Sequence, residues 1–319
     1  MSLRHGLFFA PLVSLLLCGW ACSESPSAGA PTRADAATIN DAGAPHLDAE
    51  VLVYGEMAMV PAGGFWMGCS GDDPGWCGLS APFTCCQPSE RPHHYVEVPT
   101  FWIDRTEASI SAYGECVDAG VCRRGGESAG CNWGEREQRA NHPVSCVDFE
   151  QARTFCEWRS RRLCTEAEWE KAAVGGCEFN GGEQRCRSQT RYHPWGRATP
   201  NCDLANMHIY GEQGEGLPGC GTNASSPVGS RPLGQSPYGV HDMVGNAYEY
   251  VQDCRHYSYV GAPTDGSAWT TDCESLIPGA TRGGDWRTPA VYLRSSLRWS
   301  ERPREECCGI RCCASEAPP

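Results

Sequence analysis

The number of cysteines constrains the fold of this chain more than any other feature. The 319 residues include 22 cysteines, of which Cys18 and Cys22 belong to an apolar N-terminal segment. The remaining 20 form an even set, as expected of a disulfide framework in an exported protein. A metal-thiolate cluster is the competing interpretation, but no pair of Cys-x-x-Cys motifs is present and the histidines are scattered. Abundant glycine (37) and proline (23) favour a loop-rich fold in the same way.

The N-terminal segment, residues 1–22, predicts an export signal. Arg4 precedes an apolar run from Leu7 to Leu17, and Gly19-Trp20-Ala21 places small residues just before Cys22. Cys22 then resembles the lipidation site of a bacterial lipoprotein, although such signals usually carry Leu at the position of Gly19. Secretion with the same cleavage is the alternative. A transmembrane anchor is disfavoured because the apolar run is shorter than the roughly 20 residues of a membrane span.

The net charge and the composition indicate which ligands are expected, where the domain begins and ends, and where the protein is located. The net charge of −13 argues against nucleic-acid binding and makes cations easier to bind than anions. Residues 23–50 are rich in Ala, Asp, Ser and Pro, so we expect a flexible tether. A folded domain is expected over residues 51–314, followed by a tail at 315–319. We expect an extracytoplasmic protein, periplasmic or on the cell surface, whose only membrane contact is the N-terminal lipid.

Local patterns predict a few regular elements. Ser109, Asp148 and Thr165 are suited to cap three helices, the last with a capping box through Glu168. The run Met59–Gly68 predicts a hairpin, and residues 94–98 and 101–103 predict strands. After Gly175 we expect only turns and short strands.

Three segments in fixed order carry a family resemblance. They are Arg161–Glu170 (RRLCTEAEWE), Asp242–Tyr250 (DMVGNAYEY) and Arg282–Trp286 (RGGDW). Together they resemble the formylglycine-generating enzyme, or sulfatase-modifying factor, family. Further matches in family order are Met59–Gly68, Glu90–His94, His142–Val147, Pro194–Gly196, Asn206 and Gly309–Cys312. The resemblance implies an irregular, loop-rich, disulfide-rich α+β fold with C-type-lectin-like topology.

The resemblance also indicates where the family's chemistry would lie. Active members use a copper-binding cysteine pair shortly after the two glycines to oxidise a substrate cysteine with dioxygen. Those positions fall on Thr288 and Leu293, neither of which can supply the sulfur that Cu(I) requires. The neighbouring family residues fall on Asp285, Tyr248 and Tyr292. Copper is therefore not expected, unless thiols in the C-terminal segment, Cys307, Cys308, Cys312 and Cys313, replace the pair.

Structural bonds and a calcium site follow from the same resemblance. It implies a disulfide between Cys156 and Cys312, whereas the closeness of Cys116 and Cys122 in the sequence suggests a local one. A family calcium site maps onto side-chain oxygens of Asp242 and Glu249 and main-chain carbonyls of Gly245 and Ala247, a donor set that suits Ca²⁺. A second family site keeps only Asn206.

Two functions of different class remain open. The first is a non-catalytic or repurposed calcium-binding domain that binds a protein or small-molecule ligand. The second is a copper- or iron-dependent oxidoreductase that converts cysteine to formylglycine on sulfatases. The fold alone does not decide between them.

Overall fold

The protein is described by a computed structural model that covers residues 53–54, 56–70, 86–128, 130–188, 191–211, 215–273, 279–299 and 308–318. The chain divides into two units, residues 1–45 and 46–319, and all described residues belong to the second. The predicted signal, Cys22 and the tether to residue 50 lie outside the described residues.

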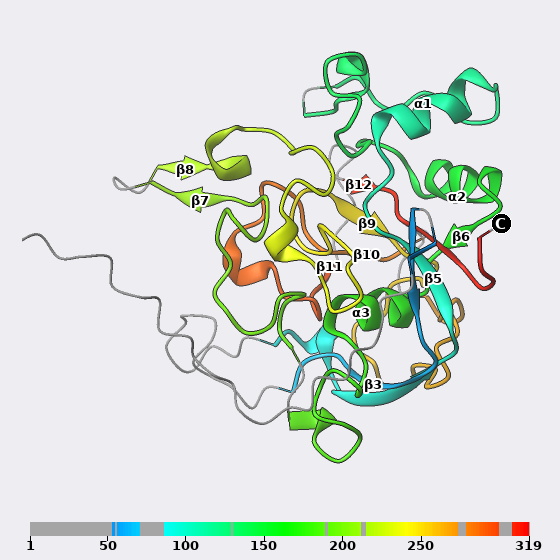
Figure 1. The fold of residues 1–319 in the computed structure, drawn as a ribbon, viewed down its shortest axis with the longest axis vertical. Coiled ribbons are helices and arrows are strands. Elements are labelled where there is room, and N and C mark those ends of the chain that lie inside the picture. The colour runs from blue at the N-terminus through cyan, green and yellow to red at the C-terminus, as the bar shows by residue number, and fades with distance from the viewer. Residues whose placement is uncertain are drawn as a thin grey trace, which may run out of the picture. The chain divides into compact units, whose positions relative to one another are not determined.

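Short strands form four small sheets (Figure 1). A five-stranded sheet has the order β1-β2-β5-β13-β6, and a four-stranded sheet has the order β11-β10-β9-β12. Two further pairs are β3-β4 and β7-β8. The strands are β1 (Val53–Tyr54), β2 (Met57–Val60), β3 (Gly63–Met67), β4 (His94–Val98), β5 (Phe101–Asp104), β6 (Arg162–Leu163), β7 (Ile209–Tyr210), β8 (Gly216–Leu217), β9 (Tyr248–Tyr250), β10 (Thr281–Arg282), β11 (Arg298–Trp299), β12 (Cys308–Gly309) and β13 (Cys312–Ala314).

The predicted hairpin at Met59–Gly68 is wrong. β2 and β3 do not pair with each other: β2 pairs with β5, and β3 pairs with β4. One antiparallel register runs through both pairs, from Met57 opposite Asp104 to Met67 opposite His94. The β2–β5 and β3–β4 pairs therefore form one two-stranded ribbon. It bends between Val60 and Gly63 on one strand and between Val98 and Phe101 on the other. The predicted strands at 94–98 and 101–103 are confirmed.

Three α-helices begin at the predicted caps. They are α1 (Ile110–Asp118), α2 (Phe149–Trp158) and α3 (Glu166–Val174). Ser109 Oγ accepts a hydrogen bond from the amide of Ala112, and Asp148 and Thr165 each form a capping box with the residue three positions on. The described residues also form six short 3-10 helices: Pro88–Glu90, Trp133–Glu135, Cys186–Ser188, Pro218–Gly221, Pro232–Gly234 and Ala290–Tyr292. No described strand after α3 is longer than three residues, as the sequence indicates.

Two apolar clusters form the core. The larger packs α3 against the bent ribbon and includes Phe65, Ile103, Trp169 and Met243, each fully buried. The second packs α1 against α2 around Tyr113, which meets the rings of Trp133 and Phe155. Figure 1 shows these two helices together, with the β7–β8 hairpin extending from another part of the domain. The fold is thus the irregular α+β architecture expected from the sequence.

Eight disulfides join the described cysteines. Cys156–Cys312 and Cys116–Cys122 are both present, and Cys164–Cys313 lies beside the first of these. The others are Cys69–Cys86, Cys131–Cys146, Cys177–Cys186, Cys202–Cys220 and Cys254–Cys273. This density is consistent with an oxidising, extracytoplasmic compartment. Among the described residues, no helix has the length and apolar character needed to cross a bilayer.

Buried His193 predicts a pH dependence of stability. Its ring is inaccessible to solvent and stacks on Trp195, and burial lowers the pKa of His193 from 6.5 to about 3. Because the unfolded chain takes up a proton near pH 6.5 and the folded chain does not, the stabilisation is complete above pH 6.5. It falls by about 1.4 kcal/mol per pH unit as the pH drops toward 3.

Equilibrium unfolding between pH 7 and pH 4 tests this dependence. His193→Phe keeps an aromatic ring at the site, and its stability should fall less steeply over that range than that of the parent protein. Parallel curves for the two proteins would contradict the assignment.

Candidate functional site

A glycine bend after β10 positions the residues that align with the family's reactive pair. Gly283 and Gly284 both have left-handed backbone conformations, with φ of 93° and 79°. A Cβ added at Gly284 would lie 3.0 Å from a methyl of Leu293 and 3.1 Å from the methyl of Thr288. The side chains of Thr288 and Leu293 therefore meet over this glycine. The structure brings the two positions together, with a hydroxyl and an isobutyl group in place of two sulfur atoms.

Thr288 is the centre of a buried hydrogen-bond network. Its hydroxyl oxygen accepts a bond from the amide of Asp285 (2.9 Å) and lies 3.0 Å from the Asp285 carboxylate and 3.3 Å from the hydroxyl of Tyr248. The same carboxylate accepts bonds from the amide and the guanidinium of Arg287. The predicted neighbours Asp285 and Tyr248 thus belong to the site, and each of their polar groups is already engaged.

Leu293 and Tyr292 have opposite environments. Leu293 is fully buried in the larger apolar cluster, whereas Tyr292 is 40% exposed. The ring of Trp299 lies 6.5 Å from that of Tyr292 and 5.8 Å from that of Tyr248, so three aromatic side chains border the network.

The thiols considered as substitutes lie in β12 and β13. Cys312 and Cys313 form disulfides with Cys156 and Cys164, respectively, so neither is a free thiol. Cys308 is buried in β12, where it is paired in parallel register with Tyr248. Cys307 lies outside the described residues.

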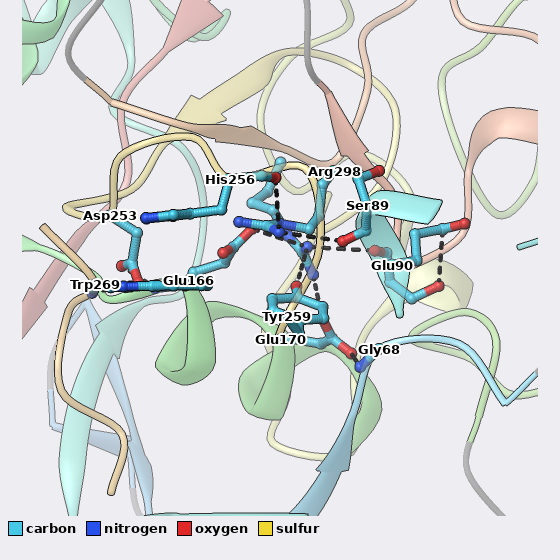
Figure 2. A network of polar contacts seen from close by, with 12 residues as sticks. Gly68, Ser89, Glu90, Glu166, Glu170, Asp253, His256, Tyr259, Trp269 and Arg298 are labelled. Atoms are coloured by element: carbon cyan, nitrogen blue, oxygen red, sulfur yellow. Dashed lines mark hydrogen bonds and ion pairs between the residues drawn. The ribbon is translucent and has the colours of Figure 1, made fainter. Parts of the chain in front are cut away.

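Glu166 and Glu170 of the Arg161–Glu170 segment connect α3 to Arg282 in β10 and to Arg298 in β11, and Figure 2 shows Glu166 beside Arg298. Glu166 accepts bonds from Arg298 (2.7 Å) and Arg282 (3.2 Å), and Glu170 pairs with Arg282 and with the amide of Gly68. All four of these charged side chains are at least 97% buried. The motif therefore anchors the strands that carry the glycine bend, a structural role.

Glu249 has partners that the sequence did not indicate. Arg311 donates bonds to both of its carboxylate oxygens, the shortest at 2.7 Å, and the indole N–H of Trp169 donates at 2.6 Å. All three side chains are fully buried. Arg311 therefore compensates the charge of Glu249 inside the core, so burial of this carboxylate does not require a metal ion.

Two other buried carboxylates, those of Asp242 and Glu107, lie next to Glu249. Asp242 is 8% exposed and accepts a bond from the amide of Gly229 (2.6 Å). Glu107 is 2% exposed; one of its oxygens accepts from the side-chain amide of Asn246 (2.9 Å), and the other has no hydrogen-bond donor. Burial, reinforced by the Asp242 carboxylate, raises the pKa of Glu107 well above its usual value.

Asn206 lies next to the same site. Its side chain is 1% exposed, and its amide nitrogen donates to the side-chain oxygen of Asn246 at 3.2 Å. Asn246 in turn reaches Glu107, so one chain of side-chain amides joins Asn206 to the carboxylates. Within the described residues, the Asn206 side chain bonds to the carbonyl of Ala224, to Asn246 and to Arg231, none of which is acidic.

The sequence analysis did not identify Glu107. It lies 135 residues before Asp242 and two residues before Ser109, the cap of α1, and no spacing pattern relates Glu107 to Asp242. A single acidic residue after Asp104-Arg105-Thr106 is too common a pattern to indicate a site.

Comparison with known proteins identifies the fold family. Residues 46–316 match the family model described as sulfatase-modifying factor enzyme 1-like domain. The chain is 26% identical to hercynine oxygenase of Mycolicibacterium smegmatis over 294 residues, a match covering 81% of this chain and 61% of that protein. It is 28% identical to the formylglycine-generating enzyme of Mus musculus over 282 residues, covering 74% and 68%. The chain spans between 52% and 61% of the length of three hercynine oxygenases.

A solved structure and a further relative extend this comparison. PvdO from Pseudomonas aeruginosa superposes with a TM-score of 0.57 at 30% identity, covering 81% of this chain and 93% of that one. The inactive C-alpha-formylglycine-generating enzyme 2 of Bos taurus is 35% identical over 128 residues, covering 39% and 37%. With a family model matched over most of its length, the chain belongs to the sulfatase-modifying factor enzyme 1-like family.

Proposed function

We propose that this protein is a non-catalytic or repurposed member of its family, a calcium-binding domain that binds a protein or small-molecule ligand. The observation that carries the proposal is the pair of side chains over Gly284. Thr288 offers a hydroxyl that is already hydrogen-bonded, and Leu293 is fully buried. Neither holds Cu(I), which requires sulfur ligands. The relationship to an inactive homologue supports the same conclusion.

Calcium is proposed at the carboxylates around the glycine-asparagine segment. The residues would be Asp242 and Glu249 through their carboxylates and Gly245 and Ala247 through their carbonyls. Glu107, Asp242 and Glu249 all interact electrostatically with the guanidinium of Arg311, and Asp242 also interacts with that of Arg231. The support for a cation here is one buried oxygen of Glu107 that has no hydrogen-bond donor. Hard oxygen donors of this kind suit Ca²⁺.

Export and anchoring complete the proposal. The N-terminal signal ending at Cys22 and the dense disulfides support an extracytoplasmic protein held at the membrane by a lipid. Mass spectrometry of the protein purified from membranes tests this step: a diacylglycerol on Cys22 is expected, and an unmodified N-terminus at residue 22 or 23 in the medium would contradict it.

A direct assay separates this proposal from the oxidoreductase alternative. The mature protein is incubated with copper, dioxygen, a thiol reductant and a cysteine peptide of the sulfatase type. No formylglycine product is expected from this protein. An active family member assayed in parallel serves as the positive control. Thr288→Cys/Leu293→Cys tests the reasoning further, because it restores the two thiols at the positions that meet over Gly284. Formylglycine formation by the parent protein would refute the non-catalytic assignment.

Calcium binding predicts a gain in thermal stability. At calcium concentrations about 100-fold above Kd, binding adds about 2.7 kcal/mol, which corresponds to roughly 5–10 °C in Tm for a domain of this size. Asp242→Asn should abolish the gain while costing little in chelator, because Asn tolerates the left-handed backbone at this position (φ 55°) and can accept the same bond from Gly229. Asp118→Asn, at an exposed ion pair with Arg136, serves as the matched control. Equal Tm values of the parent protein in calcium and in chelator would exclude the site.

A further inference from the structure

A polar cavity opens beside the glycine bend that follows β10. It has a volume of about 230 Å³ and lies between the segment at residues 130–145, the turn at residues 223–225 and the side chain of Trp286. We call it the Trp286 pocket, and six of the residues that line it are Asn132, Glu135, Arg139, Ser145, Asn223 and Trp286. The pocket has room for several water molecules. It is smaller than the roughly 300–1,000 Å³ of pockets for drug-sized ligands, so it suits one small molecule or the end of a longer one.

One wall of the pocket is held together by cross-links within the segment at residues 130–145. The side chain of Asn132 donates a hydrogen bond to the carbonyl of Pro143 at 2.6 Å and accepts one from the amide of Ser145 at 3.1 Å. The disulfide Cys131–Cys146 joins the residues directly beside these contacts. This wall is therefore fixed before any ligand binds.

The turn at residues 223–225 forms a second wall and is tied to its surroundings. Asn206 donates a hydrogen bond to the carbonyl of Ala224 at 3.0 Å. The hydroxyl of Ser225 lies 3.2 Å from Nδ1 of His142, which belongs to the first wall. A site whose walls are already joined loses little conformational entropy when a ligand binds, and this favours binding of a small molecule.

The charged groups of the pocket compensate each other. Glu135 and Arg139 form an ion pair four residues apart, and both side chains are partly exposed. A paired carboxylate can still accept hydrogen bonds and a paired guanidinium can still donate them, so the pair offers both to a ligand. Asn223 and Ser145 add an amide and a hydroxyl, each of which donates and accepts. This set favours a neutral ligand with several hydroxyl groups over an ion or a hydrocarbon.

Trp286 supplies the large apolar surface of the pocket. Its side chain is half-buried, and the guanidinium carbon of Arg287 lies 5.1 Å from its ring centroid. Its main-chain amide donates to the carbonyl of Asn246 at 3.2 Å, and its carbonyl accepts from the amide of Gly219 at 2.7 Å. These contacts hold the residue in place. An indole combines an apolar face with one N–H donor, which suits a ligand that has both C–H surface and hydroxyl groups.

We propose that the Trp286 pocket binds one neutral sugar ring, either as a free sugar or at the end of a glycan. The hydroxyl groups of a sugar both donate and accept, as the wall of the pocket does, and the C–H surface of the ring matches the indole. An ionic ligand would compete with the existing pair of Glu135 and Arg139, whereas a neutral one leaves that pair intact. Such a sugar would be the small-molecule ligand of the non-catalytic domain proposed above, and the assignment rests on that function.

The test is saturation-transfer NMR on the full mature protein, with the methyl glycosides of glucose, galactose, mannose and N-acetylglucosamine as probes. We expect saturable binding of at least one probe, with transfer to its ring protons. Glycine and sodium acetate are the charged control ligands and should not bind. A disaccharide that ends in the bound sugar separates the two sources: tighter binding than the methyl glycoside indicates the end of a glycan, and equal binding indicates a free sugar.

Two variants locate the bound sugar in the pocket. Glu135→Ala removes a hydrogen-bonding carboxylate and should raise the Kd roughly tenfold. Glu157→Ala is the matched control and should leave the Kd unchanged, because Glu157 also pairs with an arginine four residues away and is 53% exposed, against 54% for Glu135. Trp286→Leu removes the aromatic surface and should raise the Kd at least as much. Thermal unfolding checks that each variant is folded, and the exposed position of Glu135 keeps the test valid if Trp286→Leu is not.

Three results would overturn the sugar site. They are no saturable binding of any probe, an unchanged Kd in either folded variant of the pocket, and binding of glycine or acetate in place of the sugars. Failure of the proposed function gives a different result, because formylglycine formation by the parent protein would refute the non-catalytic assignment. Absence of both formylglycine and sugar binding would refute the Trp286 pocket alone.

Discussion

Replacing Arg282 by methionine is expected to destabilise the folded protein by about 3–5 kcal/mol, because it leaves the buried Glu170 carboxylate without its counter-charge and removes one of the two arginines that bind Glu166. Arg282 is inaccessible to solvent and binds Glu166, Glu170 and the carbonyl of Ser295. Its guanidinium also lies 5.1 Å from the ring centroid of Trp169. Methionine keeps much of the volume and removes every polar contact. Denaturant unfolding with the disulfides intact measures the loss.

The control for this substitution is an exposed arginine. Arg153→Met removes two ion pairs on the outer surface of α2 and should cost less than about 1 kcal/mol. The cause of the large loss can also be checked with pH. Without Arg282, Glu170 must take up a proton to remain buried, so the deficit of Arg282→Met should shrink as the pH is lowered toward 4. A loss below about 1 kcal/mol at neutral pH would show that the network is not needed for the fold.

The sequence predicted the local elements and the family, because both depend on residues that are close together in the chain. Ser109, Asp148 and Thr165 cap helices through bonds to amides three positions away, and such bonds leave a short, readable pattern. The run Met59–Gly68 gave the right strands but the wrong partner, since alternation of apolar residues does not say which distant strand completes the pairing.

The candidate site was predicted only where the family motif supplied the positions. Thr288, Asp285 and Tyr248 are joined by hydrogen bonds, and these three came from one alignment on the two glycines. Glu107 was not identified, because the side chains next to it, Asn246 and Asp242, are more than 130 residues away in the sequence. The partner of Glu249 was missed for the same reason: Arg311 lies 62 residues away and has no sequence pattern linking the two.

Cysteine connectivity shows the same limit. Twenty cysteines permit a very large number of pairings, and only Cys156–Cys312 was implied by resemblance. The neighbouring bridge Cys164–Cys313 joins α3's N-terminal flank to β13. The two bridges close nearly the same loop, with sequence separations of 156 and 149 residues. The two bridges are interleaved along the chain and share almost their whole loop, so their contributions to stability are coupled.

Removing both interleaved bridges is expected to lower the free energy of unfolding by more than the sum of the losses from removing each one. In the chain-entropy model, either bridge alone closes a loop of about 150 residues and contributes about 5 kcal/mol. Once one is present, the other closes only the short remaining circuit, from 156 to 164 and from 312 to 313, which contributes about 2.5 kcal/mol. Each single bridge removed as a pair of Cys→Ala substitutions should therefore cost about 2.5 kcal/mol, and removal of all four cysteines about 8 kcal/mol.

Unfolding in denaturant of the three variants and the parent protein measures the coupling between the bridges. The expected excess of the quadruple variant over the sum of the two double variants is about 3 kcal/mol, because the large loop stays closed until both bridges are gone. Cys116→Ala/Cys122→Ala is the matched control, because the Cys116–Cys122 bridge closes a separate loop with a sequence separation of six residues. Its removal should cost about 2 kcal/mol, and this loss should add to that from either of the interleaved bridges. The quadruple variant could instead lose only the sum of the losses of the two double variants. That result would show that the bridges do not stabilise the protein by closing the shared loop, and their effect would then come from local packing around β13.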